Sequence, residues 1–403
     1  MRRRAFLAVG GIAFGAGCSG LVGDSKREKS PPPKECAVDP SVTPGTAEWP
    51  SETGGQQNTG SVPTAEVPAP PLALDWTYTM DGYGGVPCPV VVGATVYTTN
   101  FEDELHAVNV TTGAKRWRVN RSMNAAPAVS GKRVFIAGDD AVTALDTTSG
   151  DKRWSTESAA GRGRYSTGVQ VAEGTVFVSG HMSLAAFDAS TGEERWTFIT
   201  GLEIESLPAV SDGTVYVGSD DTYLYALDAA TGDRRWRYKT DGRVSCDPVV
   251  TRDLVYVGSE EGTLYALDAR SGNERWRKEV GDIGHLAVDG GHVYVGFGSQ
   301  YGPTMLAFTA ENGVECWSSD AYEAGYASSI AASSDYLYLP VGSLSESYSE
   351  TFGALDPKTG ETVWRFSNSN VRFTSGPAVT DGAVYAGGMG TEGLTVARFV
   401  PKD

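Results

Sequence analysis

The chain has 403 residues, with 50 acidic against 33 basic side chains and a formal net charge of −17. An acidic field repels the phosphate backbone, so the composition argues against a nucleic-acid partner. The five cysteines form no Cys-x-x-Cys pair and the four histidines show no ligand spacing, so a zinc centre or a histidine-based hydrolase has little support. The acidity itself is typical of proteins kept soluble in a salty medium, which favours a salt-loving source.

Residues 1–18 read as a targeting signal rather than as part of the fold. Arg2, Arg3 and Arg4 precede an apolar run of small residues that is too short to span a bilayer comfortably. The segment from Arg3 to Leu7 resembles a twin-arginine export signal, and Ala16-Gly17-Cys18 resembles a lipobox. We therefore expect export and a lipid on Cys18 that anchors the protein to the outer face of the cell membrane. The alternative is a chance cysteine at the end of an ordinary signal.

Residues 19–73 are rich in Pro, Ser, Gly and Thr and predict a tether, because such a segment buries too little apolar area to fold alone. Cys36 lies in this tether and is predicted to be a free thiol. One patch differs from the rest: Trp49-Pro50, followed by Asn58-Thr59-Gly60, resembles the segment that precedes many propellers with PQQ-like repeats. Part of the tether is therefore a candidate to pack on the domain.

A repeat of about 40 residues governs the remainder of the chain. Its clearest copies run from Pro208 to Trp236 and from Pro248 to Trp276, and each contains three short β-type runs followed by an Arg-Trp strand. Four antiparallel strands in each unit predict the blades of a β-propeller. The unit is marked by evenly spaced tryptophans, the last seven with a glycine four positions upstream: Trp76, Trp117, Trp154, Trp196, Trp236, Trp276, Trp317 and Trp364.

The number of blades follows from the two ends of the repeat region. Seven complete units run from about Pro87 to Phe366, and an eighth begins at Gly376 but lacks its tryptophan strand. The missing strand stands at the other end, around Trp76. Pairing it with the last blade would close the ring and protect both sheet edges. We therefore predict an all-β, eight-bladed propeller over residues 74–400, built from four-stranded antiparallel blades.

The turn before each outer strand carries the motif A-x-D-x-x-x-G-x-x-x-W, as in Ala226, Asp228, Gly232 and Trp236. It resembles the tryptophan-docking motif of quinoprotein dehydrogenases and of BamB-type propellers with PQQ-like repeats. Glycine suits a left-handed turn, aspartate caps the turn's N–H groups, and tryptophan fills the space between blades, so these residues are predicted to be structural. Two copies depart from the motif, with Asn109 and Thr309 in the aspartate position.

The resemblance leaves two functions open. The dehydrogenases of this family imply PQQ, calcium, a general-base aspartate and an adjacent Cys–Cys disulfide, and this chain has no adjacent cysteines. We therefore expect no catalytic residue, cofactor or metal, with PQQ and calcium as the alternative. Cys88 and Cys246 are predicted to be small buried residues, too far apart across the ring for a disulfide. His285 could face the channel, although a structural role is the better prediction.

The remaining candidate is one loop face, which carries the connections between blades. Mixed aromatic and charged loops suit protein recognition, and ordinary solvated loops are the alternative. The preferred function is a monomeric, lipid-anchored scaffold that binds a protein partner at the cell envelope, as BamB does. The runner-up is a PQQ- or small-ligand-binding propeller with redox activity. The candidate partner-binding residues are Tyr83, Arg162, Arg164, Tyr165, Glu203, Glu205, Tyr322, Tyr326 and Arg372.

Overall fold

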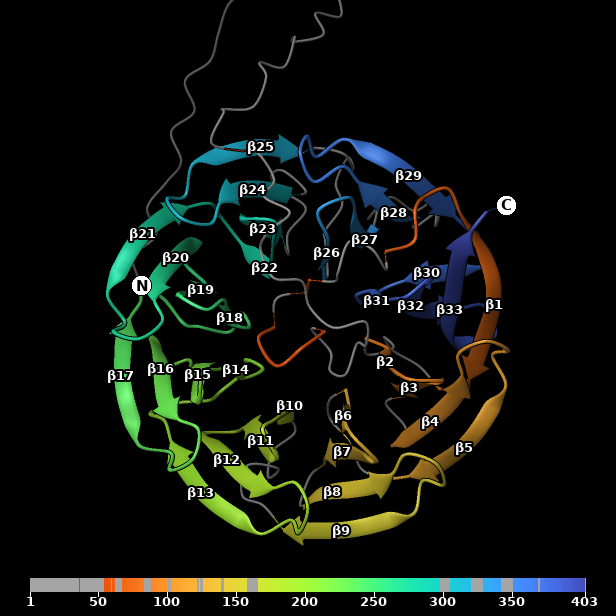
Figure 1. The fold of residues 1–403 in the computed structure, drawn as a ribbon, viewed down its shortest axis with the longest axis horizontal. Helices are drawn as coiled ribbons and strands as arrows, with labels where there is room; N and C mark the ends of the chain where they lie inside the picture. Colours follow the sequence, from red (N-terminus) through yellow and green to blue (C-terminus); the bar gives the residue numbers. More distant parts are fainter. Residues whose placement is uncertain are drawn as a thin grey trace, which may run out of the picture. The chain divides into compact units, whose positions relative to one another are not determined.

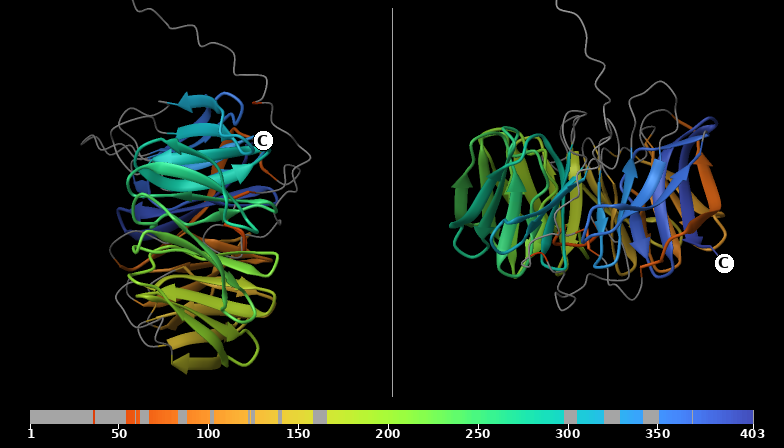
Figure 2. Two further views of the ribbon diagram at one scale, coloured as in Figure 1. Left: turned by 90° about the vertical axis from the view of Figure 1, so that its left-hand side faces the viewer. Right: turned by 90° about the horizontal axis from the view of Figure 1, so that it is seen from above.

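The computed structural model describes Cys36, residues 54–58, 60, 61, 67–82, 88–100, 103–121, 123, 126–138, 141–157, 166–297, 305–319, 329–341, 351–368 and 370–402. Among these residues, 33 strands form eight antiparallel sheets arranged as blades around a central axis (Figures 1 and 2). Within the same residues, no helix has the length and apolar character needed to cross a bilayer. The predicted eight-bladed propeller is confirmed.

Each blade runs from an inner strand at the axis to an outer strand at the rim. Blades one to four comprise β2 (Val90–Val92), β3 (Thr95–Thr99), β4 (Glu104–Asn109) and β5 (Lys115–Asn120); β6 (Ala128–Ser130), β7 (Arg133–Ala137), β8 (Ala141–Asp146) and β9 (Lys152–Glu157); β10 (Ser166–Ala172), β11 (Thr175–Gly180), β12 (Ser183–Asp188) and β13 (Glu194–Ile199); and β14 (Ala209–Ser211), β15 (Thr214–Gly218), β16 (Tyr223–Asp228) and β17 (Arg234–Lys239). Blades five to seven comprise β18 (Val249–Val250), β19 (Leu254–Gly258), β20 (Thr263–Asp268) and β21 (Glu274–Glu279); β22 (Ile283–Asp289), β23 (His292–Phe297), β24 (Met305–Thr309) and β25 (Glu315–Ser319); and β26 (Ala331–Ala332), β27 (Leu337–Val341), β28 (Thr351–Leu355) and β29 (Thr362–Ser367).

The eighth blade joins the two ends of the ring. Its strands are β30 (Val371–Phe373), β31 (Ala378–Thr380), β32 (Ala383–Gly390), β33 (Gly393–Pro401) and β1 (Leu72–Met80), with β30 and β31 both paired to β32. β1 pairs antiparallel with β33 from Leu72↔Pro401 to Met80↔Leu394. The predicted ring closure is therefore confirmed, and β30 is an additional strand in this blade.

Strand composition matches position in the blade. In blade four, β15 (TVYVG) is buried at every position, as expected of a strand covered on both faces by neighbouring blades. The outer strand β17 (RRWRYK) alternates, so that Trp236 and Tyr238 are half-buried while its arginines are exposed. The core consists of clusters between blades; one of them unites Tyr216 of blade four with Val255 and Tyr265 of blade five.

The tryptophan motif links each blade to the next. Trp196 of blade three donates its indole N–H to the carbonyl of Ala229 in blade four, at 3.1 Å. Its ring lies against Gly232, which has φ +76°. Asp228 accepts the backbone N–H groups of Ala230 and Thr231, both at 3.0 Å, and so caps the turn. Equivalent indole bonds are made by Trp76, Trp117, Trp154, Trp236, Trp276 and Trp317.

Trp364 is the exception, because the blade after it has no such turn. The outer strand of blade eight is β1, from the beginning of the ring, so no turn connects it to its neighbour β33. Trp364 instead packs against Phe352 in its own blade and Phe399 in blade eight, with ring centroids 6.1 Å apart in both pairs.

Residues 54–58, 60 and 61, here called the N-terminal strap, cross the inner strands of the ring (Figure 1). The carbonyls of Gln56, Gln57 and Gly60 accept the N–H groups of Val210, Val250 and Ala332, at 2.6, 3.0 and 2.7 Å. The strap therefore adds backbone hydrogen bonds to inner strands of blades four, five and seven.

Cys36 forms a disulfide with Cys316 in β25, and the two cysteines are 280 residues apart in the chain. The prediction that Cys36 is a free thiol in a tether is therefore wrong. Blade six lacks two charged residues of the repeat: Thr309 replaces the turn aspartate, and Cys316 replaces the arginine that pairs with it elsewhere. Position 316 therefore has no ion pair to make with the turn, and its cysteine forms the disulfide instead. Cys88 and Cys246 are buried, as predicted.

Candidate functional site

Two loops of blade four lie together on one face of the ring. This face, here called the connection face, carries the links between blades and the turns between second and third strands. The link 200–208 joins β13 to β14, and the turn 219–222 joins β15 to β16. Asp220 N donates to Glu203 O at 2.9 Å, and Ser219 Oγ donates to the same carbonyl at 3.0 Å. These bonds fix the two loops relative to each other.

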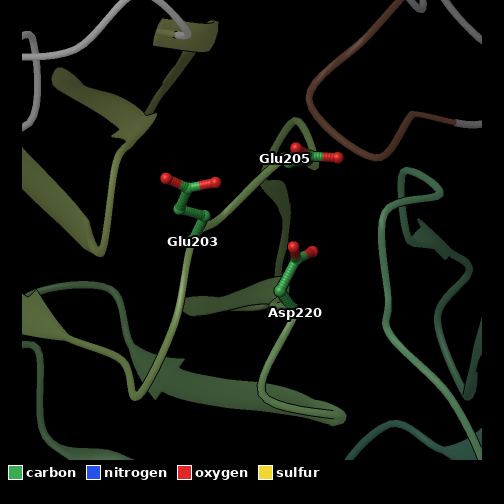
Figure 3. Close-up of side chains that lie close together, drawn as sticks. All are labelled: Glu203, Glu205 and Asp220. Atoms are coloured by element: carbon green, nitrogen blue, oxygen red, sulfur yellow. The ribbon is translucent and has the colours of Figure 1, made fainter. Parts of the chain in front are cut away.

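Three carboxylates meet at this junction (Figure 3). Glu203 and Glu205 come from the link and Asp220 from the turn, and one oxygen of each lies within 4.8 Å of the others. Glu203 and Glu205 are exposed, whereas Asp220 is buried. Burial, reinforced by Asp220 and Glu203, raises the pKa of Glu205. Burial also raises the pKa of Asp220. The positive charge of Arg243 partly offsets this rise, and the negative charges of Glu260 and Glu203 increase it. The cluster therefore concentrates negative charge.

Two basic side chains approach the cluster without neutralising it. Arg243 Nη1 lies 3.5 Å from Asp220 Oδ2, and its Nε lies 3.8 Å from a carboxylate oxygen of Glu260. His181 Nδ1 lies 3.9 Å from Glu203 Oε1. Among the described residues, Asp220 Oδ1 is buried and has no hydrogen-bond partner.

An exposed apolar patch adjoins this cluster at the edge of blade three. Ile199 is 71% exposed, Leu202 50% and Met182 37%. Their backbones are joined, because Thr200 donates its N–H to the carbonyl of Met182 at 2.9 Å and its hydroxyl to that of Leu202 at 2.6 Å. We call Met182, Ile199 and Leu202 the blade-three corner. Single exposed apolar residues are ordinary, but several that are linked through one backbone segment beside charged loops are a candidate interaction site.

A groove on the same face lies between blades five and six. It has a volume of about 320 Å³ and is lined by Ser245, Cys246, Ser259, Glu260, Asp282 and Ile283. Its two carboxylates extend the acidic character of the connection face beyond blade four. The face therefore suits a cationic or amphipathic ligand better than an anionic one.

Near the axis, the described residues form one small cavity that does not fit a quinone cofactor. The cavity between the strap and the inner strands has a volume of about 10 Å³ and is lined by Asn58, Cys246, Asp247 and His285, among others. That volume holds about one water molecule, whereas cofactor sites have volumes of about 300–1,000 Å³. Burial lowers the pKa of His285 to about 4 and raises that of Asp247 to about 6. The acidic groove between blades five and six would repel PQQ, which is a polyanion.

The structure tests only part of the predicted partner-binding set. Glu203, Glu205 and Arg372 are described, but Glu203 belongs to the link before blade four and Arg372 to β30 in blade eight, on the far side of the ring (Figure 1). The structure therefore brings Glu203 and Glu205 together and leaves Arg372 apart. Asp220 was missed by sequence reasoning, because its position reads as an ordinary turn residue of the repeat. The following predicted residues lie outside the described residues: Cys18, Tyr83, Arg162, Arg164, Tyr165, Tyr322 and Tyr326.

Solved structures with this architecture include BamB and quinoprotein-type dehydrogenases. The chain superposes on BamB from Moraxella catarrhalis with a TM-score of 0.63 and 18% identity, covering 82% of this chain and 98% of that one. It superposes on a quinohemoprotein alcohol dehydrogenase from Comamonas testosteroni with a TM-score of 0.72 and 15% identity, covering 92% and 82%. For a europium-containing methanol dehydrogenase the TM-score is 0.70 at 13% identity, with 88% and 98% covered. At these identities the likeness establishes the fold alone.

Sequence comparison identifies the family. A search of curated proteins found no match. The family described as "Outer membrane protein assembly factor BamB" matches residues 69–166, 141–280 and 239–345. These matches run through more than half of the chain and contain the tryptophan-docking turns of blades one to six. The chain therefore belongs to the BamB family of propellers with PQQ-like repeats.

Proposed function

We propose that this protein is an exported, lipid-anchored propeller on the outer face of the cell membrane that binds a protein partner and has no catalytic activity. Membership of the BamB family supports a role in protein–protein interaction at the envelope. The single observation that carries the proposal is the blade-three corner, an exposed apolar group beside the acidic loops of blade four. We propose that the connection face around it is the partner-binding surface of a monomeric propeller.

The poor fit of a quinone supports the non-catalytic part of this proposal. The cavity beside Asp247 and His285 is too small for PQQ, and the N-terminal strap packs on the inner strands around it. Calcium-dependent PQQ binding, followed by absorbance and calorimetry, tests this part. Saturable one-to-one binding would overturn it and support the alternative of a quinoprotein dehydrogenase.

Site-specific cross-linking tests the partner-binding surface. A photo-reactive amino acid is placed at Ile199 or, as a control, at Val363, which is 48% exposed on the outer strand β29 of blade seven. We expect a discrete cross-linked partner from position 199 only. That product should disappear when Leu202→Asp is added, because a charge at the corner opposes apolar docking. The same products from positions 199 and 363, or their persistence with Leu202→Asp, would contradict the proposal.

Cell fractionation tests the anchor separately. Replacing Cys18 with Ala removes the thiol that would receive the lipid, so we expect the protein to move from the membrane fraction to the soluble extracytoplasmic fraction. Continued membrane association of the Cys18→Ala variant would contradict lipidation and leave the cross-linking result unaffected.

A further inference from the structure

We propose that Glu203, Glu205 and Asp220 bind a calcium ion that joins two loops on the connection face. The proposal concerns carboxylates of the link before blade four and of one turn within that blade, and it requires no quinone. It goes beyond partner binding, because it assigns a metal site to this chain.

The geometry already suits one ion. Calcium binds oxygen ligands at about 2.3–2.6 Å, so two ligands of the same ion lie at most about 5 Å apart. One oxygen from each of the three carboxylates falls within 4.8 Å of the others (Figure 3). The three carboxylates are therefore close enough to share one ion.

A second observation concerns one carboxylate oxygen of Asp220, Oδ1. The Asp220 side chain is only 9% exposed, and among the described residues its Oδ1 has no hydrogen-bond partner. A buried carboxylate oxygen without a partner loses its hydration and gains nothing in return. Arg243 does not meet this need, because its guanidinium lies 3.5 Å from the other oxygen, Oδ2. A cation among the three carboxylates would supply the missing interaction.

The repeat provides an internal comparison. Forty residues after Glu203, Glu205 and Asp220, blade five has Arg243, Ser245 and Glu260. The backbones correspond, because Glu260 N donates to Arg243 O at 2.9 Å, as Asp220 N does to Glu203 O. In blade five the arginine itself lies 3.8 Å from its own acidic partner. Blade four has a glutamate at that position, so the basic residue of this loop is replaced by an acidic one, and Arg243 of the next loop reaches only Oδ2 of Asp220, at 3.5 Å.

The donor set selects the kind of metal. All three ligands are carboxylate oxygens, which suit hard cations, whereas zinc prefers nitrogen and sulfur. Several carboxylates on loops with room for water favour calcium, while magnesium demands a near-ideal octahedron. The bound ion would hold the link 200–208 against the turn 219–222, next to the blade-three corner.

Calorimetric titration of the purified full-length protein with calcium chloride tests the proposal. We expect one ion per chain with a dissociation constant of about 10⁻⁴–10⁻³ M, as in extracellular calcium modules. Saturating calcium should also raise the melting temperature, because the ion binds only the folded state. Absence of saturable binding, or equal affinity for magnesium, would overturn the assignment.

Three variants locate the site. Asp220→Asn and Glu203→Gln keep the side-chain shape and should each weaken calcium binding about tenfold or more, because each removes one charged ligand. The double variant Glu203→Arg with Glu205→Ser copies blade five; it should abolish binding yet fold normally without calcium, which keeps the test valid if Asp220→Asn misfolds. Glu193→Gln, in an exposed turn between β12 and β13 on the opposite face, is the matched control and should bind like the wild type. Wild-type affinity in the double variant would refute the site.

Discussion

At Gly232, two constraints coincide that only a glycine side chain can satisfy. The residue has φ +76°, and an added Cβ would lie 2.7 Å from Cδ2 of Trp196. Gly213 in the same blade has φ +66°, but the nearest atom to an added Cβ is Nη2 of Arg235, at 3.9 Å. Alanine variants of Gly232 and Gly213 therefore separate the cost of backbone strain from the cost of disturbing the contact between blades.

We expect Gly232→Ala to lower the free energy of unfolding by about 2–4 kcal/mol, since left-handed strain and overpacking against the indole add together. Gly213→Ala should cost only about 1–2 kcal/mol, from strain alone. Urea unfolding of both variants measures the difference. Equal losses would show that the docking contact contributes nothing beyond the turn.

Asp188 illustrates the charged part of the same turn. A hydrogen-bonded ion pair with Arg195, followed by the N–H groups of Thr191 and Ser190, lowers its pKa to about 2. The unfolded value is about 3.9, so the ionised carboxylate stabilises the fold fully above about pH 4. This stabilisation is lost as the pH falls towards 2.

Asp188→Asn should remove the ion pair and keep the turn cap. Asn109, which occupies the same position in blade one, accepts the N–H groups of Thr111 and Thr112 at 2.9 and 3.0 Å. The variant should therefore fold, be less stable at neutral pH and lose less stability than the wild type between about pH 4 and pH 2. Urea unfolding across this range measures both effects. Curves parallel to those of the wild type would contradict the role of the pair.

At the scale of elements, the N-terminal strap holds several blades together. It bonds to inner strands of blades four, five and seven, and the Cys36–Cys316 disulfide ties the chain before it to blade six. The amide of Asn58 donates to the carbonyls of Leu207 and Pro248, at 3.2 and 3.1 Å. A segment with little intrinsic preference for structure is thus ordered by backbone groups of the propeller.

Breaking the disulfide should measure this contribution. It closes a loop of 280 residues, so we expect Cys36→Ser to lower the free energy of unfolding by about 2–4 kcal/mol, mainly through greater freedom of the unfolded chain. Dithiothreitol should destabilise the wild type similarly and leave Cys36→Ser unchanged. Cys246→Ser, at a buried free thiol, serves as the control and should keep the sensitivity to dithiothreitol. Insensitivity of the wild type would contradict the prediction.

The sequence predicted the elements that repeat and missed those that do not. Regular spacing of glycine and tryptophan specified the blades, and the unpaired strand around Trp76 specified ring closure. The disulfide was missed because Cys36 stands in a Pro-rich segment and its partner is 280 residues away. The sequence did carry one sign of the disulfide. Blade six has Thr309 and Cys316 where other blades have the aspartate and arginine of an ion pair, so this blade departs from the repeat at both positions.

The candidate site shows the same limit at the scale of the whole molecule. Sequence reasoning placed Glu203 and Glu205 on the loop face, because links between blades share one face in this topology. It could not place Asp220 beside them, since their approach depends on the folded paths of two loops. Comparison of blade four with blade five, where Arg243 stands in the position of Glu203, would have pointed to the departure.

The excess of negative charge also belongs to the whole molecule and sets its response to salt. A formal charge of −17 repels itself in the compact state. Raising the ionic strength from about 0.1 M to about 1 M shortens the screening length from about 10 Å to about 3 Å and so weakens that repulsion. Exposed pairs such as Arg195–Asp188 are weakened as well, but such pairs are worth at most about 1 kcal/mol each.

We therefore expect the melting temperature to rise between about 0.1 M and 1 M potassium chloride, measured with a chelator present so that calcium plays no part. The Glu203→Arg, Glu205→Ser variant should show a smaller rise, because it removes two negative charges and adds one positive charge at a crowded acidic site. The Glu193→Gln control should respond almost like the wild type. A melting temperature that falls with salt would mean that the ion pairs of the docking turns outweigh the net charge, and it would remove the physical basis for the predicted preference for a salty medium.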